Sequence, residues 1–245
     1  VVRADADLDL VVDGAIFGAF GTSGQRCTST SRLVAHPDVA GAVVDRIVER
    51  AAALRLGDPQ DPKTDVGPVI TAAAAERIGA MVAVARDEGA TVACGGEAVA
   101  AEGCTGAFFA PTVLTGVAPD HTVARQEVFG PVLAVLEVAD LDEAVDVVNA
   151  VEYGLSAAVY TRDINAALHA VDRFDTGIVY VNAPTIGAEI PLPFGGTKHT
   201  GNGFREAGTR GIEQFSEVKT VYVDYSGRLQ KAQIDTHPLD PVEDR

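Results

Sequence analysis

The chain has 245 residues with 35 acidic and 19 basic side chains, which gives a formal net charge of −16. Hydrophobic residues make up 47% of it and charged residues 22%, close to an ordinary globular protein, so disorder is excluded as a description of the whole chain. The acidic balance also argues against nucleic acid or an anionic membrane surface as the main partner, because both require a basic footprint.

Three cysteines, an odd number in a long chain, do not resemble a disulfide framework. Free thiols are typical of a reducing compartment, so we expect a cytoplasmic protein. The cysteines lack zinc-ligand spacing and the histidines are scattered, so no metal site is expected. The longest apolar runs, such as 131–138, are too short to span a bilayer, and the first residues do not form a signal peptide. The chain starts on an apolar pair, as if inside a strand, which indicates a piece of a longer protein.

Helices and strands alternate along the hydrophobic pattern. In the first half it predicts helices at 7–20, 38–54 and 71–89 and strands at 31–36 and 90–94. In the second half it predicts strands at 108–114, 132–138, 155–160, 178–182 and 218–225 and helices at 140–149 and 164–174. Strands this apolar are typical of a sheet covered on both faces. We therefore predict an α/β fold with a mostly parallel open sheet flanked by helices.

Common nucleotide-binding and hydrolase motifs are incomplete in this sequence. Residues 21–24 lack the spacing of a nucleophile elbow, and 195–200 lack that of a phosphate-binding loop, so Lys198 has no such role. Residues 201–208 do not fit the glycine pattern of a dinucleotide-binding turn.

Cys27 lies in a different context from the other two cysteines. It follows Gly24 and Arg26 between a predicted helix and a predicted strand, where loops place reactive groups. Glycine lets the backbone approach a substrate, and the neighbouring guanidinium would favour the thiolate, which attacks carbonyl carbon well. Any single cysteine is more often a half-buried structural residue, and we apply that interpretation to Cys94 and Cys104.

Further segments accompany the Cys27 segment in a fixed order. Before it, residues 5–9 read Asp-Ala-Asp-Leu-Asp; after it come Gly-Asp-Pro at 57–59, Gly-Pro at 67–68, Glu-Val-Phe-Gly-Pro-Val at 127–132, Tyr-Gly-Leu-Ser at 153–156, a segment at 177–182 and Pro-Phe-Gly-Gly-Thr-Lys at 193–198. Together they resemble the NAD(P)-dependent aldehyde dehydrogenase superfamily. Colinear agreement over about the whole chain is far more specific than any single motif.

The resemblance implies a role for each matching residue. Cys27 matches the nucleophile, which forms a thiohemiacetal with the aldehyde; hydride then leaves to the nicotinamide, and the thioester is hydrolysed. Its backbone N–H would be one donor to the oxyanion. Glu127 matches the carboxylate that binds the nicotinamide ribose, Phe129 the aromatic residue beside it, and Phe194 a residue lining the substrate tunnel. Without the surrounding match, these three would be interpreted as a strand-entry acid and ordinary packing.

Parts of the family pattern are missing. The Glu-Leu-Gly-Gly segment with the general base, the dinucleotide-binding domain and the oxyanion-hole Asn are expected upstream of this chain. The chain thus resembles the C-terminal half, with a catalytic domain at 1–215 and an oligomerisation strand and tail at 216–245. The choice between NAD and NADP belongs to the missing domain. The strand at 218–225 would leave an open edge without a partner, so a homo-oligomer, dimer or tetramer, is expected.

Three hypotheses on function follow. The first is oxidation of an aldehyde to a carboxylic acid with NAD(P), as part of a full-length enzyme; the isolated chain is expected to be inactive. The second is a truncated, catalytically incompetent domain that self-associates, and the third, weaker one is a thiol esterase. Arg26, with residues 187–190 and 197–203, is similar to the semialdehyde dehydrogenase branches. Its guanidinium would either bind a substrate carboxylate in the tunnel or pair with a structural acid, and we slightly favour the second.

Overall fold

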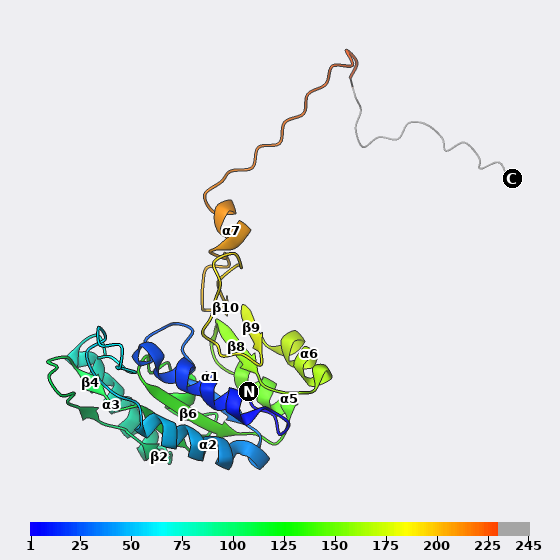
Figure 1. Cartoon of the computed structure of the whole chain (residues 1–245). Coiled ribbons are helices and arrows are strands. Elements are labelled where there is room, and N and C mark those ends of the chain that lie inside the picture. The colour runs from blue at the N-terminus through cyan, green and yellow to red at the C-terminus, as the bar shows by residue number, and fades with distance from the viewer. Residues whose placement is uncertain (230–245) are drawn as a thin grey trace.

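The computed structural model describes residues 1–229, which form an α/β unit and a C-terminal segment that projects from it (Figure 1). The helices are α1 (Leu8–Phe20), α2 (Pro37–Ala52), α3 (Ala72–Asp87), α4 (Thr122–Arg125), α5 (Leu141–Asn149), α6 (Ile164–Arg173) and α7 (Gly208–Glu213), with a 3-10 turn η1 at Gly21–Gly24. The strands are β1 (Arg32–Ala35), β2 (Thr91–Cys94), β3 (Ala98–Val99), β4 (Phe108–Phe109), β5 (Thr112–Thr115), β6 (Val132–Glu137), β7 (Tyr153–Gly154), β8 (Ser156–Val159), β9 (Ile178–Val181) and β10 (Thr197–Lys198).

The main sheet is mostly parallel. Its order is β1-β6-β5-β2; β6 runs parallel to both β1 and β5, and only the edge strand β2 is antiparallel. Strands β8 and β9 form a second parallel pair. Val2 joins the two, because its N–H donates to the Val34 carbonyl at 2.7 Å while the Arg3 N–H donates to the Tyr160 carbonyl at 3.1 Å. The predicted α/β fold with a mostly parallel sheet flanked by helices is therefore confirmed.

Strand β6 shows how the sheet is buried on both faces. Leu133 and Val135 belong to a hydrophobic core shared with α1 and α2, and the alternate residues Val132, Ala134 and Leu136 belong to a core shared with α3 and α5. Because side chains of a strand alternate between faces, this run of apolar residues requires helices on both sides.

Two helices begin at an aspartate whose side chain caps the first turn. The Asp7 carboxylate accepts hydrogen bonds from the backbone N–H groups of Asp9 and Leu10 at the start of α1, and Asp140 accepts one from Glu143 at the start of α5. These contacts satisfy N–H groups that have no partner inside the helix.

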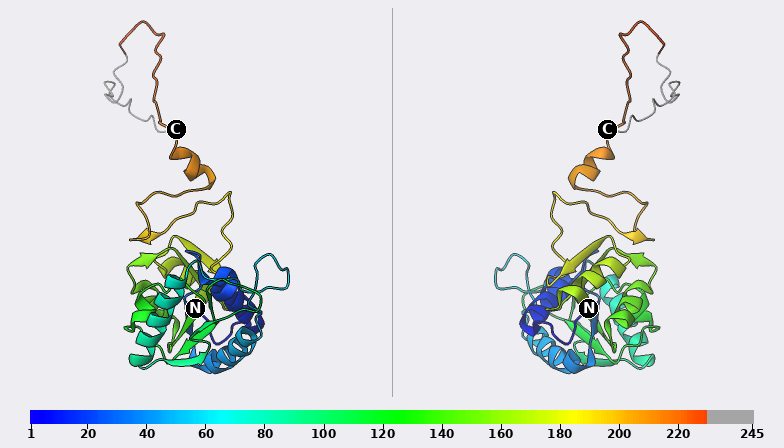
Figure 2. Two further views of the ribbon diagram at one scale, coloured as in Figure 1. Left: turned by 90° about the vertical axis from the view of Figure 1, so that its left-hand side faces the viewer. Right: turned by 90° about the vertical axis from the view of Figure 1, so that its right-hand side faces the viewer.

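Two predicted strands differ in the structure. The strand predicted at 108–114 is split into β4 and β5 around Pro111, whose ring nitrogen has no hydrogen to donate to a ladder. The strand predicted at 218–225 is an extended run without a ladder partner among residues 1–229, and it leads away from the α/β unit in every view (Figure 2). A strand needs the hydrogen-bonding groups of a neighbour, and the described residues 1–229 supply none there. Residues 230–245, the rest of the predicted tail, lie outside the described residues.

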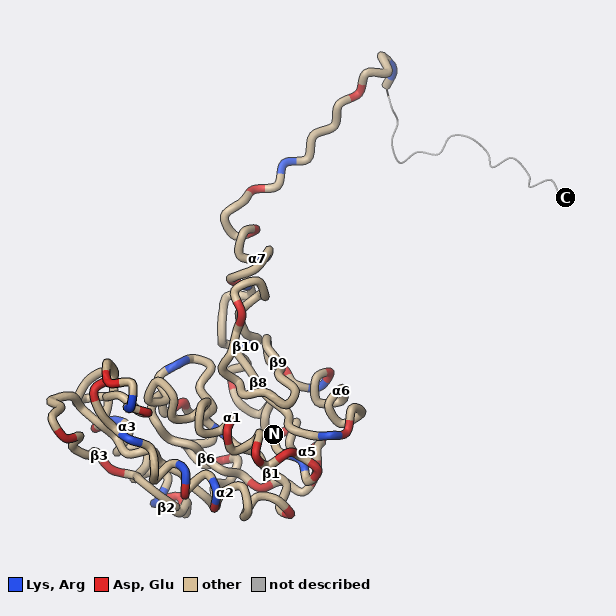
Figure 3. The backbone as a smooth tube through the Cα atoms, viewed as in Figure 1, with Lys and Arg blue, Asp and Glu red and all other residues tan. Residues whose placement is uncertain are grey.

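Charged residues of both signs are distributed over the helices of the α/β unit, with no separate basic stretch among the described residues (Figure 3). Within residues 1–229, every helix is too short or too polar to cross a membrane.

Candidate active site

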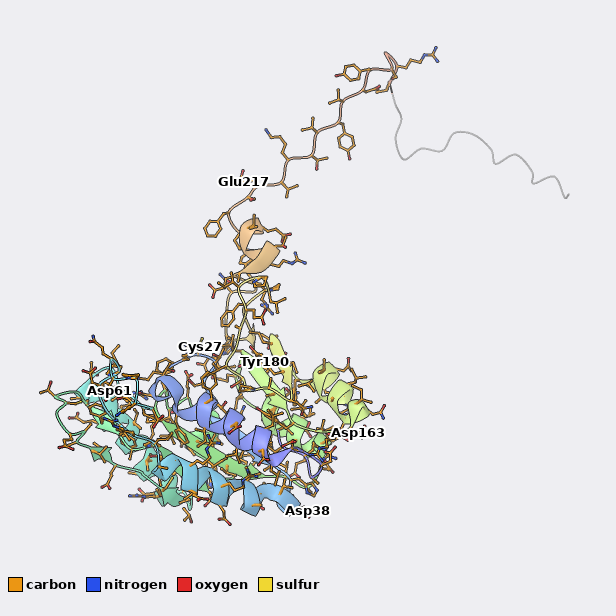
Figure 4. The ribbon with its side chains drawn as sticks, viewed as in Figure 1. Cys27, Asp38, Asp61, Asp163, Tyr180 and Glu217 are labelled. Carbon is orange, nitrogen blue, oxygen red and sulfur yellow. The ribbon has the colours of Figure 1, made fainter. Side chains whose placement is uncertain are left out.

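Cys27 sits in a tight turn just after η1, at the edge of the α/β unit where the C-terminal segment leaves it (Figure 4). The Ser29 N–H donates to the Arg26 carbonyl at 3.0 Å, and the Arg26 N–H donates to Ser29 Oγ at 3.1 Å. Cys27 itself is exposed, and its backbone N–H has no hydrogen-bond partner among the described residues. The turn therefore presents a thiol and a free N–H donor together.

Gly24 fixes the near end of this turn. Its φ of +66° lies in the left-handed region, which favours glycine. It also packs against Gly130, so that the segment before Cys27 lies directly on the 127–130 loop. The Cys27 segment and the segment at 127–132, which are distant in sequence, are therefore in direct backbone contact in the fold.

Cys27 lines two separate cavities. The first, of about 210 Å³, also has Glu127 and Tyr153 in its wall, and we call it the Glu127 cavity. The second, of about 790 Å³, has Phe194 and Phe204 in its wall, and we call it the Phe194 cavity. The thiol thus lies where a group in one cavity and a group in the other can both reach it.

Glu127 is exposed as a whole residue, yet the surrounding protein desolvates its carboxyl and raises its pKa, while the Arg77 guanidinium acts in the opposite direction. Arg77 projects from α3 and donates to the Val128 carbonyl at 2.6 Å and to the Phe129 carbonyl at 3.4 Å. Phe129 adopts a left-handed φ of 49°, an uncommon conformation for an aromatic residue. Arg77 therefore holds the strained backbone next to Glu127, whereas the Phe129 side chain lines neither cavity.

Phe194 is held in the wall of its cavity by backbone pairing. Its N–H donates to the Glu206 carbonyl at 2.6 Å, and the Glu206 N–H donates back at 2.8 Å. Lys198, four residues on, donates from Nζ to the Asn149 carbonyl at 2.8 Å and to the Val151 carbonyl at 3.1 Å. Lys198 thus ties the glycine-rich segment to the end of α5.

Arg26 is placed differently from either prediction. Its side chain is exposed, it lines neither the Glu127 cavity nor the Phe194 cavity, and it forms no ion pair with any residue in 1–229. The structure therefore brings together Cys27, Glu127 and Phe194 and leaves Arg26 outside. The turn geometry explains this, because Arg26 is bound through its backbone atoms only.

Sequence reasoning missed two residues that support this site. Arg77 gave no signal, since an arginine on a predicted amphipathic helix is usually a solvated surface residue. Thr185 gave none either, although its hydroxyl reaches the turn of Cys27 at Thr28. No group of three or more potential metal ligands occurs among residues 1–229.

Known proteins show the family to which this chain belongs. The sequence profile of the aldehyde dehydrogenase family matches residues 1–221, and the chain belongs to that family. It is 38% identical over 225 residues to a betaine aldehyde dehydrogenase of Brucella melitensis. The matched region is 91% of this chain and 46% of the relative. The chain thus spans less than half the length of the curated relatives it matches.

Solved structures show the same fold. A crystal structure of an NAD-dependent aldehyde dehydrogenase from Sinorhizobium meliloti superposes with a TM-score of 0.88 and 37% identity, over 95% of this chain and 45% of that one. Two others have TM-scores of 0.84. One is a betaine aldehyde dehydrogenase from Staphylococcus aureus in complex with NAD⁺ (32% identity, 87% of this chain and 42% of that one). The other is a glyceraldehyde-3-phosphate dehydrogenase from Methanocaldococcus jannaschii complexed with NADP (34% identity, 90% and 46%).

Proposed function

We propose that this chain is the C-terminal, catalytic half of an aldehyde dehydrogenase that oxidises an aldehyde to a carboxylic acid with NAD or NADP, and that Cys27 is its nucleophile. The observation that carries the proposal is the place of Cys27 between two cavities, with Glu127 in the wall of one and Phe194 in the wall of the other. An oxidation of this kind needs a hydride acceptor and a substrate on two sides of one reacting atom.

The residues present fit one end of the cofactor. Glu127 places a carboxylate, a hydrogen-bond acceptor for ribose hydroxyls, in the same small cavity as the thiol. When bound, NAD(P)⁺ supplies the hydride acceptor. Related structures contain NAD⁺ in one case and NADP in another, and the proposal includes both.

The chain's own contribution to the chemistry starts at the Cys27 sulfur. Sγ bonds to the aldehyde carbon, the carbonyl π bond opens, and the thiol proton balances the charge on oxygen. The unpartnered Cys27 N–H is placed to donate to that oxygen as its negative charge develops. Arg77 keeps the neighbouring loop in the conformation that exposes Glu127.

Acylation of Cys27 tests the nucleophile without any cofactor. Mixing the 245-residue chain with p-nitrophenyl acetate should release a stoichiometric burst of nitrophenolate, because Sγ displaces it from the ester carbon. Cys27→Ser should abolish the burst, and the matched control Cys94→Ser should retain it. A burst that survives Cys27→Ser would refute the assignment.

We further propose a semialdehyde as the substrate class, on the similarity of residues 187–190 and 197–203 to the semialdehyde branches. The wall of the Phe194 cavity carries both Arg205 and Glu206, so its formal charge does not decide the matter. The substrate class can be tested through reversible thiohemiacetal formation, because an aldehyde bound to Cys27 blocks alkylation of the thiol. Succinic semialdehyde should protect Cys27 from iodoacetamide better than butanal and betaine aldehyde do; equal protection would remove the semialdehyde preference.

We also propose that the protein works in the cytoplasm, because its three cysteines are free thiols. The exposed apolar side chains of the C-terminal run support a homo-oligomer. The chain alone is proposed to be incompetent for turnover, because it spans less than half of its relatives.

A further inference from the structure

The far end of the Cys27 turn is tied to a loop from a distant part of the sequence. Thr185, in the segment after β9, approaches two residues that follow Cys27. Its Oγ1 lies 2.7 Å from the Thr28 carbonyl oxygen and 2.9 Å from Thr30 Oγ1. Thr28 is 7% exposed, so its carbonyl cannot readily exchange this contact for water.

The direction of both hydrogen bonds follows from elementary chemistry. A carbonyl oxygen only accepts, so the single hydroxyl hydrogen of Thr185 is donated to Thr28. Thr30 must then donate its own hydrogen to Thr185 Oγ1. Gly18 of α1 leaves room for this arrangement, because a Cβ atom there would lie 2.2 Å from Thr30 Oγ1.

Thr185 is itself held on both sides. Before it, Asn182 accepts from the Thr161 N–H at 3.0 Å through Oδ1 and donates to the Thr161 carbonyl at 2.9 Å through Nδ2. After it, Ile186 is buried, with 5% exposure. The hydroxyl of Thr185 is therefore a fixed point against which the Cys27 turn rests.

We propose that Thr185 is a positioning residue for the nucleophile: by holding the Thr28 carbonyl, it keeps the backbone N–H of Cys27 aimed at the reacting carbonyl oxygen. Gly24 constrains the turn before Cys27, and Thr185 constrains it after, so the peptide between them has one orientation. The inference rests on the proposed role of Cys27 as the nucleophile. It adds a residue whose side chain lies outside the walls of the Glu127 and Phe194 cavities.

Two reactions of the same thiol separate positioning from mere folding. Acylation by p-nitrophenyl acetate passes through an oxyanion and uses the N–H donor, whereas alkylation by iodoacetamide displaces iodide and forms no oxyanion.

Thr185→Val keeps the shape of the side chain and removes both hydrogen bonds, whereas Thr185→Ser restores a hydroxyl. In the 245-residue chain, we expect Thr185→Val to slow Cys27 acylation about tenfold, part of the loss seen when an oxyanion donor is removed outright, with alkylation unchanged. Thr185→Ser should recover the acylation rate.

Thr112→Val is the matched control, since Thr112 also donates to a partly buried backbone carbonyl, that of Ala110 at 2.7 Å, but has no bond to the Cys27 turn. It should leave both rates unchanged. If Thr185→Val does not fold, as judged by its thermal transition, Thr30→Val tests the same network and should lower acylation in the same selective way. Equal loss of acylation and alkylation, or no loss of either, overturns the inference while leaving Cys27 as the nucleophile. A wild-type chain in which Cys27 cannot be acylated overturns the proposed function as well.

Discussion

Gly24 packs so closely on Gly130 that a Cβ atom at position 24 would lie 2.0 Å from the Gly130 carbonyl oxygen. Real Cβ atoms do not approach a backbone oxygen to this distance. The contact joins the segment that presents Cys27 to the loop that presents Glu127. The relative placement of the thiol and the carboxylate therefore depends on the absence of one side chain.

Gly24→Ala should destabilise the fold and misplace the thiol. The left-handed φ of +66° costs an alanine about 1–2 kcal/mol, and displacing a backbone carbonyl adds an overpacking cost of similar size, so we expect a loss of about 3 kcal/mol in the free energy of unfolding. Urea unfolding measures this loss. Gly41→Ala is the control, because nothing lies within 4 Å of its Cβ position in α2, and it should stabilise by about 0.5–1 kcal/mol. Similar effects of the two variants would contradict the contact.

Cys27 should be the first thiol to react with iodoacetamide. It is exposed, whereas Cys94 is half-buried, donates to the Pro111 carbonyl at 3.6 Å, and has its pKa raised by burial. A buried thiol with less thiolate reacts more slowly, and we expect a difference of at least about tenfold. Peptide mass spectrometry after limited labelling gives the ratio. Preferential modification of Cys94 or Cys104 would show that the turn does not present Cys27.

Local patterns in the sequence predicted the framework of the fold. The apolar run of β6 and the start of the helix predicted at 140–149 depend on neighbours in sequence, so they could be read directly. The strand at 218–225 could not be placed, because its alternation says nothing about which chain supplies the partner.

The candidate site needed more than local pattern. Cys27 could be singled out from its glycine-flanked loop, but Glu127 and Phe194 were identified only by their resemblance to family motifs. The bond from Thr185 to Thr28 joins residues 157 positions apart, and no periodicity encodes such a contact. For Arg26 the sequence left two alternatives, a substrate carboxylate or a structural acid, and slightly favoured the acid; the side chain is exposed, and residues 1–229 supply no acid that pairs with it.

The 245-residue chain alone should form no NADH or NADPH from any aldehyde, although its Cys27 can be acylated. Glu127 can hold only one end of the cofactor, and loss of positioning by itself can remove several powers of ten in rate. Fluorescence of the reduced cofactor measures turnover. Activity that persists after removal of any full-length contaminant, and that disappears in Cys27→Ser, would show that residues outside this chain are not needed.

Self-association should depend on the C-terminal run. Val218, Tyr222 and Tyr225 are between 92% and 96% exposed, and unpaired extended backbone with apolar side chains is a ready surface for another chain. We expect at least a dimer by light scattering. Removal of residues 216–245 should reduce the particle mass, while a full chain that is a clean monomer at high concentration would contradict this expectation.

In the 245-residue polypeptide, made with a free amine at Val1, that amino group should make stability depend on pH. It donates to the Ala158 carbonyl at 2.7 Å inside the sheet, and desolvation, with a smaller contribution from the Arg32 charge, lowers its pKa from 8.0 to about 5. Between these two values the unfolded chain binds a proton that the folded chain does not. Stability rises with pH wherever the unfolded state binds more protons.

For the polypeptide that starts with a free amine at Val1, the free energy of unfolding should therefore be lowest near pH 5 and rise up to pH 8. About three pKa units correspond to at most about 4 kcal/mol. Urea unfolding over this range, compared with the same chain acetylated at Val1, isolates the effect, because acetylation removes the titrating group and other titrations cancel in the difference. If both forms show the same slope, the amine is not desolvated in the sheet, and the pairing of Val2 with Ala35 and Tyr160 would have to be revised.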